Sequence, residues 1–156
     1  MTKEIGDKIS DFALVDHHGE TVKLSERLAD GPVVLAFFPA AFTGVCTAEM
    51  CEFRDSLKEF EDLSASVLGV SVDIRFSLAE FAKQQNLNFP LLSDFNKEVI
   101  TELGVRDDNF IGMKGVAQRS VFVVKPDQTI AYKWVAENPG VSPDLDETRK
   151  ALSSLN

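Results

Sequence analysis

The segment VVLAFFPAAFTGVC, residues 33–46, places an unbroken apolar run directly before a loop and a cysteine. Val33–Phe38 is apolar throughout and is bounded by Gly31-Pro32 and by Pro39, which is typical of a strand that is covered on both faces of a sheet. After the loop, apolar side chains recur every three or four residues from Thr43 to about Leu63, which predicts an amphipathic helix. A buried strand followed at once by a helix indicates an α/β fold.

Strands and helices alternate along the rest of the chain. Residues 66–72 are predicted to form a second buried strand. Ser77 stands where a helix cap is expected, with Glu80 at the capping-box position. The other predicted elements, in chain order, are strands at Asp11–Asp16 and Thr21–Leu24, a short helix capped by Ser25, a strand at Phe89–Leu92, a helix from Asn96 or Lys97 to Leu103 before Gly104, an irregular loop at Arg106–Gly115, strands at Ser120–Val124 and Ile130–Trp134, and a helix at Asp144–Leu155.

This order of elements predicts a thioredoxin-like arrangement within the α/β class. Alternating strands and helices that end in an antiparallel hairpin favour a mixed central sheet with helices on both faces and an N-terminal β-hairpin. The sequence contains no internal repeat, low-complexity tract or linker. We therefore expect a single domain over residues 1–156, a size that buries about two-thirds of the surface exposed by the unfolded chain.

Composition and charge exclude several classes of function. The net charge of −9 repels phosphate backbones, which argues against a nucleic-acid partner. The apolar run at Val33–Phe38 is far shorter than the roughly 20 residues of a membrane span, so we expect no membrane insertion. The first residues carry neither a basic region nor an apolar region of a secretory signal, and this predicts a cytoplasmic location.

The two cysteines, Cys46 and Cys51, are too few for a disulfide scaffold and favour chemistry instead. With Thr43 as N-cap, Cys46 is the third residue of the predicted helix. There the unpaired backbone N–H groups and the helix dipole both favour an anion, which for cysteine is the thiolate. Cys46 is therefore a candidate nucleophile; the alternative is that it is a small buried apolar residue.

Cys51 lies on the same predicted helix as Cys46. In an intact helix their Cα atoms are about 8.6 Å apart, whereas a disulfide needs less than about 7 Å. A bridge therefore requires the first turns to unwind; otherwise Cys51 is only a packed side chain. The Cys-x-x-x-x-Cys spacing also differs from the Cys-x-x-Cys of thioredoxin-type exchangers, which argues against a protein disulfide oxidoreductase.

A metal site is not indicated. Metal binding by imidazole or thiolate needs at least three convergent ligands. The only histidines are His17 and His18, and both fall in the predicted hairpin turn, where polar residues are common.

The string Phe38-Pro39-Ala40-Ala41-Phe42-Thr43-Gly44-Val45-Cys46 resembles the Pro-x-x-x-Thr-x-x-Cys signature of the peroxiredoxins, thiol peroxidases with a modified thioredoxin fold. The resemblance continues through Phe89–Asp94 and Gly115–Val124 in the family's order, so it covers nearly the whole chain. Within the family, the sequence is similar both to the alkyl hydroperoxide reductase E-like branch and to the bacterioferritin comigratory protein branch.

The resemblance implies that Cys46 is the peroxidatic cysteine, whose thiolate attacks hydrogen peroxide or an organic hydroperoxide and becomes a sulfenic acid. No metal, flavin or haem cofactor is required. Thr43 matches the threonine whose hydroxyl bonds the thiolate and the peroxide, and Pro39 matches the proline that shields the sulfur from water. Arg119 matches the arginine that stabilises the thiolate and holds the peroxide. Glu49 matches a position that orients this arginine, unless it is an ordinary first-turn carboxylate.

Cys51 stands at the resolving position of the second branch, whereas the first branch usually has one cysteine. The resemblance thus implies an intramolecular disulfide that a thioredoxin- or glutaredoxin-like protein reduces. It also implies a monomer or a homodimer, in which apolar side chains supply the contact or merely cover the pocket: Phe42, Phe110, Ile111 and Met113. A redox sensor or holdase that uses the same oxidation of Cys46 is the alternative from another class.

Overall fold

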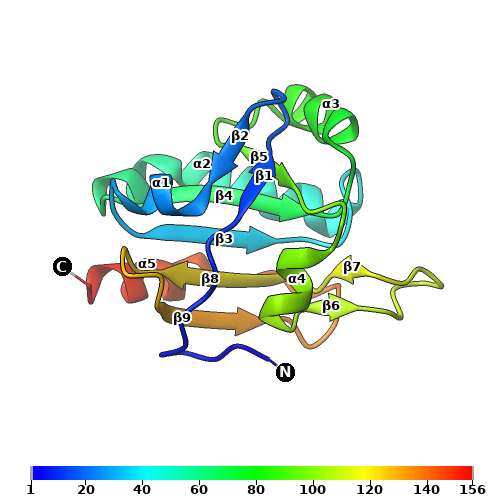
Figure 1. Cartoon of the computed structure of the whole chain (residues 1–156). Coiled ribbons are helices and arrows are strands. Elements are labelled where there is room, and N and C mark those ends of the chain that lie inside the picture. Colours follow the sequence, from blue (N-terminus) through cyan, green and yellow to red (C-terminus); the bar gives the residue numbers. More distant parts are fainter. Residues whose placement is uncertain (1, 156) are drawn as a thin grey trace.

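A mixed five-stranded sheet forms the centre of the computed structural model, which describes residues 2–155 (Figure 1). The strand order is β5-β4-β3-β8-β9. The neighbours β3, β4 and β5 are parallel, and β8 is antiparallel to both β3 and β9. The mixed sheet predicted from the sequence is confirmed. The strands are β3 (Val33–Phe37), β4 (Ser66–Ser71), β5 (Leu91–Ser93), β8 (Ser120–Val124) and β9 (Ile130–Val135).

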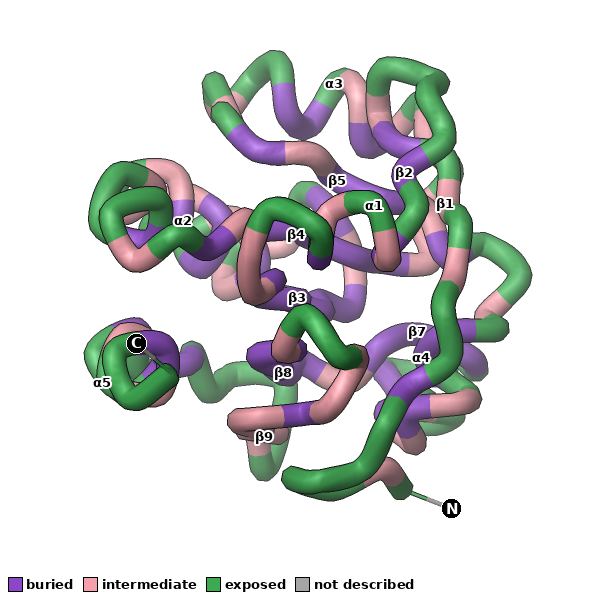
Figure 2. Tube along the Cα trace, turned by 60° about the vertical axis from the view of Figure 1, so that its left-hand side comes forward, coloured by how far each residue is buried: buried purple, intermediate pink, exposed green. Residues whose placement is uncertain are grey.

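Helices cover both faces of this sheet because the central strands are apolar on both sides. In β3, Val34 and Ala36 belong to one core cluster, and Val33, Leu35 and Phe37 belong to the other. The first cluster packs under α2 (Gly44–Asp62), α3 (Arg75–Gln85) and α5 (Leu145–Ser153), and the second packs under α1 (Leu24–Leu28) and α4 (Glu98–Leu103). Figure 2 shows the central strands as buried segments between these layers.

The N-terminal hairpin is present with strands shorter than predicted, β1 (Ala13–Val15) and β2 (Thr21–Lys23). The buried Asp16 carboxylate closes the turn by accepting the backbone N–H groups of His18 and Glu20, each at 2.9 Å. His17 does more than fill the turn: its backbone N–H donates to the Leu91 carbonyl at 2.9 Å, and its Nδ1 accepts the Leu91 N–H at 3.1 Å. His17 therefore attaches the hairpin to β5.

The predicted Ser77 cap is wrong. The N-cap of α3 is Ile74, and Ser77 lies inside the first turn, so Glu80 is not part of a capping box. The chain leaves β4 in a turn that is held by side-chain hydrogen bonds between Ser71 and Asp73. This turn starts the helix earlier than the local pattern predicts.

Three other predictions are also wrong. The N-cap of α1 is Lys23, so Ser25 lies inside the helix rather than at its cap. Short strands β6 (Arg106–Asp107) and β7 (Val116–Ala117) pair antiparallel where an irregular loop was predicted, because two-residue strands carry no detectable alternation. Strand β5 begins at Leu91 rather than Phe89, since Pro90 has no N–H to donate to a neighbouring strand. The end of α4 at Gly104, with φ +75°, agrees with the prediction.

Within residues 2–155, we find no helix that has the length and apolar character needed to cross a bilayer.

Gly31, immediately before β3, predicts a large effect on stability. Its φ is +139°, and a Cβ added there would lie 2.3 Å from the Ser64 carbonyl oxygen. We expect Gly31→Ala to lower the free energy of unfolding by about 2 kcal/mol or more, measured by urea unfolding. Gly44→Ala is the matched control, because a Cβ on Gly44 meets open space; it should be neutral or stabilising by up to about 1 kcal/mol. Equal stabilities of the two variants would contradict this account.

Candidate active site

The loop after β3 sets the position of Cys46. Thr43 is the N-cap of α2 with extended backbone, so Cys46 is the third residue of the helix, as the sequence predicts. Just before the cap, Phe42 has φ +69°, which is unusual for a bulky residue. This turn directs the chain from the end of the sheet into the first turn of α2. The sulfur therefore lies where the helix dipole favours negative charge.

Three of the predicted site residues form one buried chain of contacts. Arg119 precedes β8, and its Nη2 donates to the Cys46 Sγ at 3.0 Å. Its Nη1 donates to Glu49 Oε1 at 2.6 Å. All three residues are buried. The guanidinium thus bridges the sulfur and a carboxyl group that lie almost one turn apart on α2.

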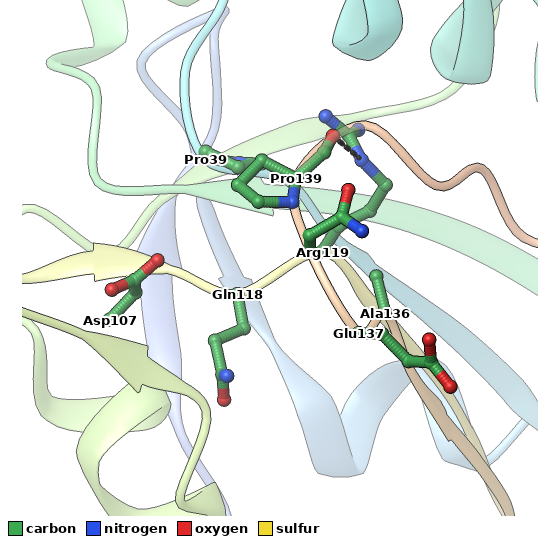
Figure 3. Close-up of a pocket in the computed structure, with 8 residues that line it drawn as sticks. Pro39, Asp107, Gln118, Arg119, Ala136, Glu137 and Pro139 are labelled. Atoms are coloured by element: carbon green, nitrogen blue, oxygen red, sulfur yellow. Dashed lines mark hydrogen bonds between the residues drawn. The ribbon is translucent and has the colours of Figure 1, made fainter. Parts of the chain in front are cut away.

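Arg119 has a third partner that the sequence did not suggest. Its Nε donates to the carbonyl oxygen of Pro139 at 3.2 Å, in the loop between β9 and α5 (Figure 3). Pro39 and Pro139 line a cavity of about 60 Å³ together with Arg119 and with Asp107, Gln118, Ala136, Glu137 and Asn138. This volume holds only a few water-sized molecules. Because Cys46 itself is fully buried, a substrate has to pass the covering side chains to reach the sulfur.

Two acidic groups, the Cys46 thiol and the Glu49 carboxyl group, contact the single guanidinium of Arg119. Burial raises the pKa of Glu49 from its ordinary value of 4.5 to about 8, although the charge of Arg119 and its hydrogen bond act in the opposite direction. The close ion-pair distance shows that Arg119 attracts the carboxyl group, but the loss of solvent outweighs that attraction. In addition, Glu49 Oε2 is buried without a hydrogen-bond partner. Near neutral pH Glu49 is therefore protonated and uncharged. The positive charge of Arg119 then acts on the Cys46 sulfur without competition from a carboxylate.

Thr43 and Cys51, like Pro39, lie outside this chain of contacts. The Thr43 hydroxyl donates to the Ala40 carbonyl at 2.9 Å, so its hydrogen goes to the loop backbone rather than to the sulfur. Cys51 is half-buried on the intact helix, and its thiol contacts Gln85 Oε1 of α3 at 3.4 Å. Both cysteines are free thiols. Over residues 2–155, no group of three His, Cys, Asp or Glu side chains is placed to hold a metal ion.

Pro139 and Asp73 are the contacts that sequence reasoning missed. Asp73, at the end of β4, accepts the backbone N–H of Ala41 in the loop before Cys46. Its position after a parallel strand is a weak signal, because such strand ends commonly carry site residues. Pro139 acts through its backbone carbonyl, which no side-chain pattern reveals.

Comparisons with known proteins agree with this geometry. The model of the AhpC/TSA family matches residues 5–133. A Mycobacterium tuberculosis protein classed by name among the peroxiredoxins is 42% identical over 125 residues, which are 80% of this chain and 80% of that protein. The chloroplastic peroxiredoxin Q of Oryza sativa subsp. japonica is 37% identical over 152 residues, 96% of this chain and 67% of that protein.

The fold has solved counterparts as well. The crystal structure of peroxidoxin BcpB from Mycobacterium tuberculosis superposes with a TM-score of 0.88 at 36% identity and covers 97% of both chains. The architecture is thus the thioredoxin-like fold of thiol-dependent peroxidases. The chain belongs to the AhpC/TSA family of peroxiredoxins and is a thiol-dependent peroxidase.

The buried Glu49 predicts a specific pH dependence of stability. Between about pH 4.5 and about pH 8 the folded protein holds a proton on Glu49 that the unfolded chain releases, so the free energy of unfolding falls as pH rises. One such proton contributes at most about 1.4 kcal/mol per pH unit. Glu49→Gln cannot titrate, so its urea-unfolding free energy should change less between pH 5 and pH 8 than that of the wild type.

The exposed Glu61 on the same helix is the control for this experiment, because it is not among the groups that shift the pKa of Glu49. Glu61→Gln should keep the wild-type slope. Parallel curves for the wild type and Glu49→Gln would mean that Glu49 is ionised across the whole range.

Proposed function

We propose that Cys46 is the residue that reduces peroxides. Its thiolate attacks one peroxide oxygen, the O–O bond breaks, and the distal oxygen leaves as water or an alcohol after taking up a proton. The products are the Cys46 sulfenic acid and the reduced substrate. Hydrogen peroxide and organic hydroperoxides are the proposed substrates, since the reacting group is common to both.

The observation that carries this proposal is the 3.0 Å contact between Arg119 Nη2 and Cys46 Sγ in a buried site. A guanidinium remains charged and offers several donors in a fixed plane. It stabilises the thiolate before the reaction and the negative charge on the departing oxygen during it. Glu49 and the Pro139 carbonyl hold the guanidinium in that plane.

Pro39 and Thr43 complete the proposed site. Pro39 lines the small cavity together with Arg119, and we assign to it the shielding of the sulfur from water. The Thr43 hydroxyl is occupied by the Ala40 carbonyl in the absence of substrate. Rotation about its Cα–Cβ bond would offer the hydroxyl to a bound peroxide, so we assign Thr43 to substrate binding.

Cys51 is the proposed resolving residue. Its thiol attacks the sulfenic sulfur of Cys46, which forms the disulfide and releases water. Since both cysteines lie on one intact helix, the first turns of α2 must open for this step. The product disulfide would then be exposed to a thioredoxin- or glutaredoxin-like reductant, and a cytoplasmic location is part of the same proposal.

Intact mass spectrometry tests this cycle directly. After one equivalent of hydrogen peroxide, the reduced wild type should lose two hydrogen atoms, whereas Cys51→Ser should retain a sulfenic acid on Cys46 that dimedone traps. A trapped sulfenic acid in both proteins would indicate a one-cysteine peroxidase that needs an external thiol. If Cys46 does not react rapidly in either protein, its assignment as the peroxidatic residue is wrong.

The choice between a monomer and a homodimer concerns the apolar residues near the site. Phe42, Ile111 and Met113 are 52%, 82% and 44% exposed, whereas Phe110 is buried and serves the fold. Ile111 and Met113 lie in the loop between β6 and β7, and exposed apolar side chains support self-association. We therefore propose a homodimer whose contact includes this loop and Phe42.

Sedimentation equilibrium over a concentration series checks this proposal. We expect a dimer that Ile111→Glu weakens about tenfold or more, because the charge would be buried in the contact. Ile5→Glu is the control. The exposed Ile5 precedes Gly6, whose backbone N–H donates to the Ile130 carbonyl at the start of β9. Ile130 lies at the end of the sheet opposite to the loop that carries Cys46. A wild type that stays monomeric at every concentration would refute the dimer.

A further inference from the structure

Asp73, at the end of β4, connects the sheet to the loop that carries the reactive cysteine. Its Oδ2 accepts the backbone N–H of Ala41 at 2.9 Å and the hydroxyl of Ser71 at 2.7 Å. The Ser71 hydroxyl oxygen in turn accepts the backbone N–H of Asp73 at 3.2 Å, and the Asp73 carbonyl accepts the Ser93 hydroxyl at 2.6 Å. Ser71 of β4 therefore holds the carboxylate, and Ser93 of β5 holds the Asp73 backbone, while the carboxylate holds the loop.

The anchored residue is next to a strained one. Phe42 follows Ala41 directly and has φ +69°, a conformation that costs a bulky side chain energy and persists only where the surroundings enforce it. Its ring packs against Phe81 of α3 with centroids 5.3 Å apart. The backbone bond to Asp73 and this ring contact enforce the turn from two sides. Thr43, the N-cap of α2, follows immediately.

We propose that Asp73 is a positioning residue that sets how often the first turn of α2 opens. The Ala41 N–H to Asp73 hydrogen bond keeps the strained Phe42 turn closed and thereby keeps Cys46 beside Arg119. When that bond is absent, Phe42 relaxes out of the left-handed region, and the start of α2 loses its fixed entry. Asp73 acts through the loop and does not touch the reacting atoms.

This inference rests on the proposed cycle in one respect, because opening of α2 is the step that brings the Cys46 sulfenic acid to the Cys51 thiol. If opening precedes that reaction, the rate of disulfide formation scales with the open population. Loss of a charge-assisted hydrogen bond in a half-buried site should raise that population about tenfold. The reaction of the closed Cys46 thiolate with peroxide should change less than threefold.

Hydrogen exchange of the reduced protein, without peroxide, tests the inference independently of the cycle. We expect amides in residues 41–50 to exchange about tenfold faster in Asp73→Ala than in the wild type. Asp73→Asn keeps a side-chain oxygen that can accept the Ala41 N–H, so it should restore slow exchange. Ser71→Ala removes one bond that holds the carboxylate and should show an intermediate effect; it also carries the test if Asp73→Ala does not fold.

Asp94 provides the matched control. It is a buried aspartate at the end of the neighbouring strand β5, and it accepts the backbone N–H groups of Val99 and Ile100 at 3.2 and 2.9 Å. Asp94→Ala should destabilise α4 without faster exchange in residues 41–50. If both alanine variants accelerate exchange there equally, the effect is general destabilisation and the inference is wrong.

Rapid mixing with peroxide then separates the two proposals. Faster disulfide formation in Asp73→Ala, with rescue by Asp73→Asn, supports both the positioning role and the two-cysteine cycle. Faster exchange in a protein whose wild type forms no disulfide would support the positioning role and overturn the cycle. Unchanged exchange in residues 41–50 of Asp73→Ala would overturn the positioning role, whatever the disulfide kinetics.

Discussion

The active site depends on a single buried cation. A guanidinium removed from water is costly unless acceptors surround it, and Arg119 has three: the Cys46 sulfur, the Glu49 carboxyl group and the Pro139 carbonyl. Each acceptor comes from a different part of the site, namely the first turn of α2, the following turn and the β9–α5 loop. The requirement to satisfy one arginine therefore draws these segments together. Burial of the same site also explains why Glu49 retains its proton to an unusually high pH, since the loss of solvent outweighs the attraction of Arg119.

The order of strands in the sheet brings this cation to the sulfur. Strands β3 and β8 are antiparallel neighbours, with Phe37 paired to Ser120. The last residue of β3 and the first residue of β8 therefore lie side by side at the same end of the sheet. Arg119 immediately precedes Ser120, and the loop to Cys46 leaves from Phe37, so the two side chains converge from opposite chain directions. The apolar interior that surrounds them strengthens the electrostatic interaction between the guanidinium and any negative charge that develops on the sulfur.

Helix α2 has two opposed tasks in the proposed cycle. Its intact first turn holds Cys46 against Arg119, but the same regular geometry keeps Cys46 apart from Cys51. A site of this kind needs a closed state that is stable enough for reaction with peroxide and an opening that is not too costly. The contacts of the loop with Asp73 and Phe81 lie outside the reacting groups. They could therefore tune the opening without changing the chemistry at the sulfur.

The amino-acid sequence by itself determined the elements whose pattern is local. The apolar run at Val33–Phe38 and the periodicity after Thr43 predicted β3, α2 and the position of Cys46, because these features depend on neighbouring residues. The same local reasoning failed at Ser77, where a turn held by Asp73 starts α3 earlier, and at the two-residue strands β6 and β7. The family resemblance already implied that Arg119 meets Cys46 and Glu49. Only the tertiary structure decided the contact of Arg119 with the Pro139 carbonyl, the burial that raises the pKa of Glu49, and the anchor at Asp73. Arg119 and Cys46 are 73 residues apart in the sequence, and the packing of the sheet and its helices, rather than any local pattern, determines which distant groups lose water and meet.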